Sequence, residues 1–353
     1  MTRRGVDDRA KTLYGDPTCA NIMGGMAFHW YEQMMATFNV NSTYWLNPSK
    51  ILLATEGCNC PGVSPGDWGR AEHYGRDVLA DLMNWAQGWV DWNLVLDSIG
   101  GPNHVHNYCD AMIIANHKNQ TILVQPSYYY MGQISKYLVP GSVRISSTLN
   151  IALPANVTSV APLASGDNVI LWQCNGSPTQ RWVVPAAGSA GNISVLGSNL
   201  CLAASVTNSV DSGENAQLSV CGNTPSQTWS VPANDTVGSI VTKLDSTCLE
   251  VAGSSLQNSA NAQQANCTSG LNQRWLFNST DSTIRSQLQP NMCLTAGWSP
   301  VNAQAFRRPD GKIVLIVMNE SNVPISFKVR DVTSTVKAFA TSIPPHAIQT
   351  YLY

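Results

Sequence analysis

The sequence has little charge and no long apolar run. Of its 353 residues, 12% are Asp, Glu, Lys or Arg, and the formal net charge is −2. Nucleic-acid-binding proteins gather Lys and Arg into a basic patch, and surface anchors on membranes need a polybasic cluster. The scattered charges therefore predict neither class. No apolar run reaches the roughly 20 residues of a spanning helix, so no transmembrane segment is expected.

The beginning of the sequence also lacks a signal peptide, because MTRRGVDDRAKTLYGD contains no apolar core. Yet the chain has 10 cysteines and is rich in Asn-x-Ser/Thr sequons, which is typical of an oxidising, glycosylating compartment. We therefore expect a secreted or lysosomal/vacuolar protein whose signal peptide lies upstream of residue 1. The sequons begin at Asn41, Asn119, Asn156, Asn175, Asn192, Asn234, Asn266, Asn278 and Asn319.

The first 140 residues alternate predicted strands and helices. GGMAFHWY (24–31), ILLATE (51–56) and GWVDWNLVL (88–96) have the pattern of strands. YGRDVLADLMNWAQ (74–87) has helical periodicity, with Val78, Leu82 and Trp85 on one face. Apolar strands separated by helices predict parallel β/α units.

The last 50 residues change to β patterning. KIVLIVMN, PISFKVRD and AIQTYLY are predicted strands, and RPDGK is a predicted hairpin turn.

The middle of the chain is a repeat rich in Asn, Ser, Ala and Gln. LWQCNGSPTQRW, LSVCGNTPSQTW and QANCTSGLNQRW each place Gln-x-Trp shortly after a cysteine, at spacings of 47 and 46 residues. NLCLAAS, TCLEVAG and NMCLTAG form a second series. This segment resembles the ricin-type β-trefoil lectins. The signature residues are Trp182, Trp229 and Trp275 in the first series and Cys201, Cys248 and Cys293 in the second.

The order of these elements is permuted. The first Gln-x-Trp has no Cys-Leu element before it, and the last Cys-Leu element has no Gln-x-Trp after it. Joining 283–299 to 161–184 completes the third repeat, so the two ends of the trefoil should meet, as in a domain inserted into a loop. The resemblance implies the disulfides Cys201–Cys221, Cys248–Cys267 and Cys174–Cys293.

Glu56 is the candidate catalytic residue that the pattern suggests. It ends a predicted strand, His29 and Tyr31 end the preceding one, and Asp91, Trp92 and Asn93 lie on the next. In a β/α barrel, catalytic groups stand at the carboxyl ends of strands, and this mixture of carboxylate, imidazole, phenol and indole suits a sugar. By itself, a Glu at a strand end is more often a solvated loop residue.

Two nearby cysteines, Cys58 and Cys60, leave several interpretations open. A metal pair is one, but a C-x-C without a second pair is a weak signal, and a disulfide or free thiols are favoured. The pairing of these two residues with Cys19 and Cys109 is not determined by the sequence.

Longer motifs carry a family resemblance. DDRAKTLYGDPTCANIMGGMAFHWY, ILLATEGC, GWVDWNLVLDSIGGPNHVHNYCDAMII and QPSYYYMGQISKYLVPGSVRI resemble the glucosylceramidases of glycoside hydrolase family 30, as does RRPDGKIVLIVMNES through PPHAIQTYLY. The resemblance implies a multidomain α/β plus all-β protein: a partial (β/α)8 TIM barrel with the last three strands, a β-sandwich, and a β-trefoil inserted in the sandwich. The expected bounds are 1–138 for the barrel, 139–150 and 301–353 for the sandwich, and 155–300 for the trefoil.

The resemblance also implies roles for residues. Glu56 would be the catalytic nucleophile, and His29, Tyr31, Trp92 and Asn107 would bind the sugar. His106 stands where the family has Arg, and the loop 57–69 is shorter than in the animal lysosomal enzymes.

The family's acid/base Glu follows an Asn about a hundred residues before the nucleophile, and this chain has 55 residues before Glu56. The sole Asn-Glu, Asn319-Glu320, lies in the sandwich. We therefore expect a C-terminal portion of a larger enzyme that alone hydrolyses glycosides poorly, with no metal or cofactor.

The substrate implied by the resemblance is glucosylceramide or a related β-glucoside. Two alternatives stay open: another specificity such as β-1,6-glucanase or xylanase, and a non-catalytic carbohydrate-binding protein that works through its trefoil. A possible glycan site in the trefoil is incomplete in every repeat. Its candidate residues are Glu250, Asn272, Gln273 and Trp172.

Overall fold

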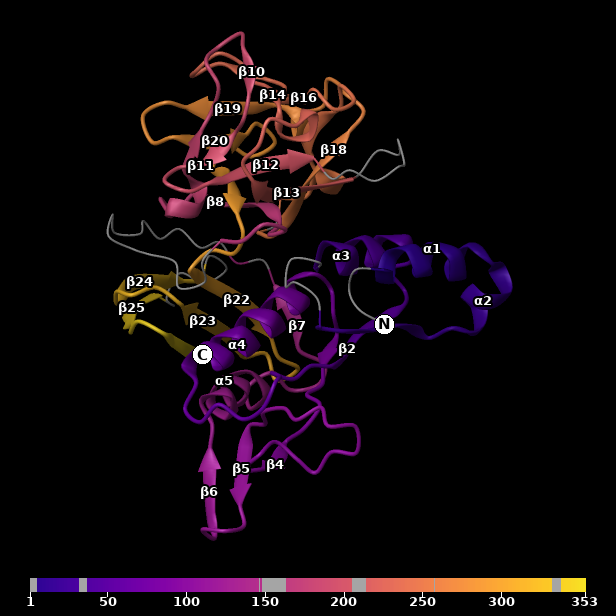
Figure 1. The fold of residues 1–353 in the computed structure, drawn as a ribbon, viewed down its shortest axis with the longest axis vertical. Coiled ribbons are helices and arrows are strands. Elements are labelled where there is room, and N and C mark those ends of the chain that lie inside the picture. Colours follow the sequence, from indigo (N-terminus) through magenta and orange to yellow (C-terminus); the bar gives the residue numbers. More distant parts are fainter. Residues whose placement is uncertain are drawn as a thin grey trace. The chain divides into compact units, whose positions relative to one another are not determined.

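The computed structural model places the chain in two compact units (Figure 1). The first contains the β/α segment and most of the C-terminal strands, and the second contains the repeat segment. The first unit spans 1–147, 301–320 and 328–353, and the second spans 148–300 and 321–327. The structure describes residues 5–31, 37–145, 147, 163–204, 214–256, 258–331 and 338–353.

A parallel three-stranded sheet carries the candidate nucleophile. Its strands are β1 (Gly25–His29), β2 (Ile51–Glu56) and β3 (Gly88–Trp89), in that order. Met26 and Phe28 of β1 and Leu52 and Ala54 of β2 point to one buried face, because alternate residues of a strand share a face. The helices of this segment are α1 (Val6–Gly15), α2 (Pro17–Ile22), α3 (Thr37–Leu46) and α4 (Trp68–Met83).

Two predictions about this segment are wrong in extent. The predicted third strand, 88–96, keeps a regular ladder only over β3, although the N–H groups of Val90 and Trp92 still bond to Ala54 O and Gly57 O. The predicted helix 74–87 begins earlier, at Trp68, because the Asp67 side chain caps it by accepting a hydrogen bond from Arg70 N. It also ends earlier, at Met83.

A second small sheet follows the first. In it, β4 (Val95–Asp97) runs parallel to β5 (Ile113–Asn116), which pairs antiparallel with β6 (Thr121–Val124). Next comes α5 (Pro126–Ser135), which packs against α4. A Cβ on Gly75 of α4 would come within 2.7 Å of the Tyr130 ring of α5, so the close approach of the two helices needs a glycine there.

The C-terminal strands form antiparallel sheets. The larger sheet has the order β26-β23-β22-β7, and the predicted RPDGK turn lies between β22 and β23. Its strands are β7 (Val143–Ile145), β22 (Val301–Arg307), β23 (Ile313–Asn319) and β26 (Ala347–Leu352). A two-stranded sheet contains β24 (Ile325–Arg330) and β25 (Ala338–Ile343).

Glu320, the residue after β23, is buried and forms an ion pair with Arg76 of α4, with Nη1 and Oε1 2.8 Å apart. The sole Asn-Glu of the sequence is thus a packing feature in the interior of this unit.

The second unit is a β-trefoil whose three repeats use the same hydrogen bonds. The indole N–H groups of Trp182, Trp229 and Trp275 donate to Leu294 O, Leu202 O and Leu249 O, at 2.9, 2.9 and 2.8 Å. All three Trp side chains lie in one buried apolar core. The Gln-x-Trp motif is therefore structural in this chain.

The trefoil strands are β8 (Val169–Gln173), β9 (Trp182–Val183), β10 (Ala190–Gly191), β11 (Ser194–Val195), β12 (Leu200–Ala204), β13 (Glu214–Val220), β14 (Trp229–Ser230), β15 (Val237–Gly238), β16 (Val241–Thr242), β17 (Cys248–Val251), β18 (Ala260–Ala265), β19 (Trp275–Asn278), β20 (Thr283–Ser286) and β21 (Met292–Ala296). Short 3-10 helices lie at Pro178–Gln180, Pro225–Gln227, Ala252–Ser254 and Leu271–Gln273.

The two ends of the trefoil meet, as the permuted order predicts. β8, the first strand, pairs antiparallel with β21, the last, over five residue pairs from Met292↔Gln173 to Ala296↔Val169. The Trp182–Leu294 hydrogen bond closes the same repeat. The disulfides Cys174–Cys293, Cys201–Cys221 and Cys248–Cys267 are the pairs that the ricin-type resemblance implies.

Two of the sequons cannot accept a glycan in the folded chain. Asn175 and Asn319 are buried, and their amide groups donate to Ser299 Oγ at 2.9 Å and to Pro344 O at 2.8 Å. Asn156 lies outside the described residues. Among the helices that the structure describes, none has the length and apolar character needed to cross a bilayer.

Candidate active site and candidate glycan-binding cluster

The backbone around Glu56 is fixed from both sides. Trp30 N–H, just after β1, donates to Glu56 O at 3.1 Å, and Trp92 N–H, after β3, donates to Gly57 O at 2.8 Å. A Cβ on Gly57 would come within 2.6 Å of the Trp89 ring, so only glycine fits there. These contacts hold the Glu56 side chain at the carboxyl edge of the sheet, where barrel enzymes place catalytic groups.

His29 and Tyr31 are brought to Glu56. His29 Nδ1 lies 3.7 Å from Glu56 Oε1, and the His29 and Tyr31 rings meet edge to face with centroids 6.0 Å apart. Burial, together with hydrogen bonds to Cys58 and Glu56, raises the pKa of Tyr31. The phenol therefore stays protonated and can donate a hydrogen bond toward Glu56.

Trp92 is exposed rather than part of the core, with 56% of its surface accessible. Its backbone N–H also donates to Asp91 Oδ1 at 2.8 Å, and the same oxygen accepts a hydrogen bond from the Tyr74 hydroxyl at 2.8 Å. Burial raises the Asp91 pKa to about 6 despite these hydrogen bonds. Asp91 and Tyr74 thus hold the backbone segment from which the Trp92 ring projects into solvent. The sequence did not predict this positioning role for either residue.

Asn107 lies on an exposed loop held by Asn103. The Asn103 amide donates to Asn107 O at 2.7 Å, and Asn107 N–H donates back to Asn103 Oδ1 at 3.1 Å. Asn103 was missed, although an Asn four residues before a predicted site residue is a recognisable loop-forming signal. The loop is tied to the segment after Glu56 by the disulfide Cys60–Cys109, which the sequence left open.

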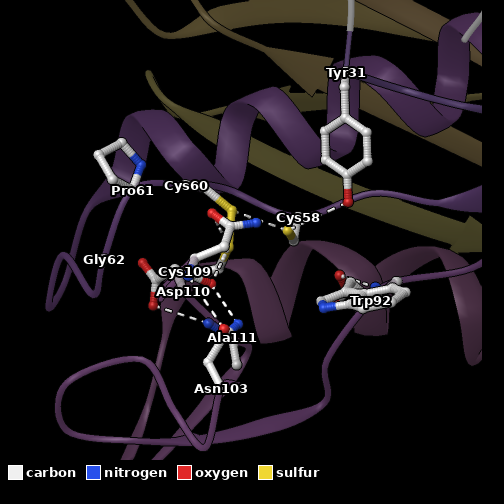
Figure 2. Close-up of a disulfide and its surroundings, with 12 residues drawn as sticks. Tyr31, Cys58, Cys60, Pro61, Gly62, Trp92, Asn103, Cys109, Asp110 and Ala111 are labelled. Atoms are coloured by element: carbon white, nitrogen blue, oxygen red, sulfur yellow. Dashed lines mark hydrogen bonds between the residues drawn. A yellow bond between two sulfur atoms is a disulfide. The ribbon is translucent and has the colours of Figure 1, made fainter. Parts of the chain in front are cut away.

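Cys58 is a buried free thiol beside that disulfide (Figure 2). Its Sγ lies 3.5 Å from the Tyr31 hydroxyl and 3.1 Å from Cys60 Sγ. Within the described residues, Cys58, Cys60 and Cys109 are the one group with the spacing of three metal ligands. The disulfide occupies two of these sulfurs, so the cluster as it stands offers one thiol and no thiolate triad.

The trefoil brings together three of its four candidate residues. Glu250 Oε2 accepts hydrogen bonds from the amides of Asn272 at 3.2 Å and Gln273 at 2.9 Å, and Oε1 accepts one from Gln263 at 2.8 Å. The prediction for Trp172 is wrong. Its side chain is fully buried and packs against Trp298 with ring centroids 5.3 Å apart, so it has no free face for a sugar.

Comparisons with known sequences match all three parts of the chain. Residues 2–138 match the TIM-barrel domain of glycosyl hydrolase family 30, residues 284–351 match the β-sandwich domain of the same family, and residues 155–237 and 236–310 match the ricin-type β-trefoil lectin domain. The two family 30 matches together span more than half of the chain.

Curated relatives and a solved structure agree with these matches. Putative glucosylceramidase 4 of Caenorhabditis elegans is 42% identical over 135 residues, 37% of this chain and 26% of that protein. Lysosomal acid glucosylceramidase of Mus musculus is 33% identical over 144 residues, 39% of this chain and 28% of that protein. The crystal structure of SrfJ from Salmonella typhimurium shares the fold, with a TM-score of 0.52 at 17% identity, covering all of this chain and 45% of SrfJ.

The matching part of this chain thus spans about a quarter of the length of these two curated relatives. The sheet ending at Glu56 lies within the barrel match, and the strands β8 to β21 of the trefoil lie within the lectin matches. The sandwich match covers β22 to β25 and most of β26, and it also includes β21 of the trefoil. The chain therefore belongs to glycosyl hydrolase family 30 and carries a ricin-type β-trefoil lectin domain.

Proposed function

We propose that the chain is the nucleophile-bearing portion of a retaining β-glucosidase of the glucosylceramidase type. The observation that carries the proposal is the cluster at the end of β2, where Glu56 Oε1 lies 3.7 Å from His29 Nδ1 and the protonated Tyr31 packs edge to face against His29. In a retaining glycosidase, such a carboxylate attacks the anomeric carbon and forms a covalent glycosyl–enzyme intermediate.

The residues around Glu56 suit this role. The protonated Tyr31 hydroxyl can donate a hydrogen bond toward the Glu56 carboxylate and orient it, and His29 Nδ1 lies 3.7 Å from Glu56 Oε1. The exposed Trp92 ring offers a face on which a sugar ring can stack, and the exposed Asn107 side chain can form hydrogen bonds with hydroxyl groups. In this arrangement Glu56 reacts, while His29, Tyr31, Trp92 and Asn107 bind and orient the sugar.

A retaining mechanism needs a second carboxyl group about 5–5.5 Å from the first, to protonate the leaving oxygen. We propose that this acid is supplied from outside residues 1–353. Glu320 does not fit the role, because it is buried in an ion pair with Arg76. The chain alone should then react with glycosides whose leaving group departs without protonation, and should leave ordinary glycosides intact.

The proposed substrate is glucosylceramide or a related β-glucoside, acted on in a secretory or lysosomal compartment. This proposal is supported by sequence identity. Two glucosylceramidase relatives are 42% and 33% identical to this chain, whereas an endo-1,6-β-D-glucanase of Aspergillus fumigatus is 25% identical to it over 127 residues. A β-1,6-glucan is the runner-up substrate.

The test is covalent trapping of the nucleophile. The chain is incubated with 2,4-dinitrophenyl 2-deoxy-2-fluoro-β-glucoside, whose leaving group needs no acid, and intact mass spectrometry measures the adduct. We expect one fluoroglucosyl group, mapped to the peptide that contains Glu56. Adding azide to a reaction with 2,4-dinitrophenyl β-glucoside should yield β-glucosyl azide, since attack on the intermediate restores the original configuration.

Two variants make the trapping test specific. Glu56→Gln should abolish the adduct, whereas Glu250→Gln, the same substitution in the trefoil, should leave it unchanged. An adduct on another carboxylate, or an equal adduct in Glu56→Gln, would refute Glu56 as the nucleophile.

A second function, glycan binding by the trefoil, is favoured by the Glu250 cluster. A carboxylate accepts up to about four hydrogen bonds, and three amide donors already hold Glu250. One acceptor position therefore remains for a sugar hydroxyl, beside the partly exposed Asn272.

A further inference from the structure

The free thiol of Cys58 lies against an existing disulfide. Cys58 Sγ is 3.1 Å from Cys60 Sγ, and the ligand atoms of Cys58, Cys60 and Cys109 all lie within 4.8 Å of one another. Figure 2 shows the three sulfurs together, with the Tyr31 hydroxyl pointing at Cys58. Exchange between a thiol and a disulfide begins when the thiolate reaches a disulfide sulfur, and here the two are already in contact.

We propose that Cys58, Cys60 and Cys109 form an intramolecular thiol–disulfide exchange site. The Cys58 thiolate attacks Cys60 Sγ, the Cys58–Cys60 bond forms, and the Cys60–Cys109 bond breaks. Cys109 leaves as a thiolate and takes up the proton that Cys58 released. One disulfide and one thiol are present before and after, so the step needs no oxidant or reductant.

The surrounding backbone holds the three cysteines in place whichever pair is bonded. Asp110 N–H donates to Asn59 O at 2.8 Å, and Gly62 N–H donates to Tyr108 O at 2.6 Å. These bonds join the segment of Cys58 and Cys60 to the segment of Cys109 without the disulfide.

Arg70 adds a second clamp between the same segments. Its guanidinium donates to Gly62 O at 2.7 Å, to Pro61 O at 3.1 Å and to Asp110 Oδ2 at 2.7 Å. The Cys109 sulfur thus stays near its partners after the bond opens, which makes the exchange reversible.

The exchange changes the contacts of two residues in the proposed sugar site, so its effect on catalysis rests on the function proposed above. In the present state Cys58 Sγ contacts the Tyr31 hydroxyl, and this contact is lost when Cys58 bonds to Cys60. Cys109 Sγ lies 3.6 Å from Asn107 O and 3.8 Å from Asn107 Oδ1, so a released Cys109 thiol gains two acceptors.

The environment of Cys58 sets the rate of this exchange. Burial raises the pKa of the Cys58 thiol, the Tyr31 hydrogen bond acts in the opposite direction, and the Asp91 and Glu56 carboxylates raise it further. Because only the thiolate attacks, exchange is slow in acid, and the Cys60–Cys109 arrangement persists there. Cys60 is exposed, so an external thiol can also reach the disulfide.

Differential alkylation of the full chain tests the site. The protein is incubated at pH 8.5 without added thiol, quenched in acid and alkylated with N-ethylmaleimide in urea, and the labelled cysteines are mapped by mass spectrometry. We expect label on Cys19 and Cys58 at time zero, followed by label on Cys109 that rises as label on Cys58 falls. The half-buried free thiol Cys19 is an internal control whose label stays constant.

Two variants sharpen the result. Cys58→Ser should reduce Cys109 labelling at least tenfold, because no attacking thiol remains. Cys109→Ser, incubated with glutathione disulfide as the oxidant, should form the Cys58–Cys60 bond, which is the product of the proposed step.

Three outcomes would overturn the proposal. Cys109 could stay unlabelled in the wild type, or its label could persist in Cys58→Ser. The third is label on Cys60 in place of Cys109, because the new disulfide would then be Cys58–Cys109. None of these readouts depends on glycosidase activity. Trapping of Glu56 with the fluoroglucoside tests the proposed function separately, so either can fail alone.

Discussion

The trefoil and the barrel segment bury their apolar residues to different degrees. The trefoil has one continuous core drawn from strands along its whole length, and it includes Trp182, Trp229 and Trp275. The parallel sheet buries one face, with Leu52 and Ala54, while Ile51 and Leu53 on the other face are 45% and 37% exposed. Parallel sheets normally have both faces covered.

This difference shows how far the trefoil segment and the β/α segment can each form a complete core from their own residues. Every trefoil repeat supplies strand residues and a Trp to a shared core and carries one disulfide, and the first strand pairs with the last, so the unit closes on itself. The β/α segment supplies a sheet whose open face has the apolar pattern of a barrel interior.

The largest expected effect is on the closure of the trefoil. Replacing Cys174 and Cys293 with Ser removes a bridge between residues 119 apart, which should lower the free energy of unfolding of the trefoil by about 4–5 kcal/mol in the chain-entropy account. Urea titration with hydrogen exchange measured on trefoil and barrel peptides separately would show which unit loses protection. Cys19→Ser is the matched control. Equal loss in the barrel peptides would contradict the independence of the two units.

The two units should respond to acid in opposite directions. Burial raises the pKa of Asp91 to about 6 and that of Glu320 to about 7, so the folded first unit binds protons more tightly than the unfolded chain. Its stability should rise as the pH falls from above 7 toward 4, by about 3 kcal/mol for each group.

In the trefoil, hydrogen bonds from Ser279 lower the pKa of Asp235, and those from Thr283 and Arg285 outweigh burial to lower that of Asp281. That contribution is complete above pH 4 and is lost below it. Peptide-level hydrogen exchange of each unit at pH 3, 4.5 and 7.5 tests the contrast, because the trefoil contribution changes only below about pH 4. Asp91→Asn should remove about half of the rise in the stability of the first unit, because Glu320 still titrates, and a profile unchanged by that substitution would argue against the role of Asp91.

The threefold equivalence of the trefoil predicts a smaller, uniform effect. Trp182→Phe, Trp229→Phe and Trp275→Phe each remove one N–H and leave a buried carbonyl of Leu294, Leu202 or Leu249 without its donor. Each should cost about 1–3 kcal/mol, with the three values within about 1 kcal/mol of one another. Trp45→Phe in the barrel segment, where the side chain is 62% exposed, should cost less than about 0.5 kcal/mol. Unequal costs would show that the repeats differ in stability.

The smallest effect concerns the Glu250 cluster. Glu250→Gln exchanges a charged acceptor for an amide in contact with three amide donors, and should weaken binding of a simple sugar such as galactose or lactose about threefold to tenfold, equivalent to about 1 kcal/mol. Titration calorimetry on the wild type and the variant measures this. Asp245→Asn, an exposed acidic residue on the same repeat, is the control. Identical affinities would remove this cluster from consideration as a glycan site.

Much of the fold was determined by the sequence. Gln-x-Trp and Cys-Leu spacing fixed the three trefoil repeats and their permutation, because each repeat must present the same residues to one core. The strand ILLATE was predicted with the bounds of β2, and the motifs around Glu56 predicted both the family and the edge of the sheet where it stands. Local periodicity and repeated spacing are enough to predict strands and repeats, because both kinds of element are defined by which of their faces is apolar.

The tertiary structure alone decided how distant side chains combine. The sequence did not show that Cys60 pairs with Cys109, that Cys58 remains a thiol in contact with both Tyr31 and Cys60, or that Trp172 is buried against Trp298 and unable to stack on a sugar. It likewise did not show that Asp91 and Tyr74 position the Trp92 segment. Each of these depends on segments from different strands and loops approaching within a few ångströms, and such proximity is set by packing rather than by the pattern of any one segment.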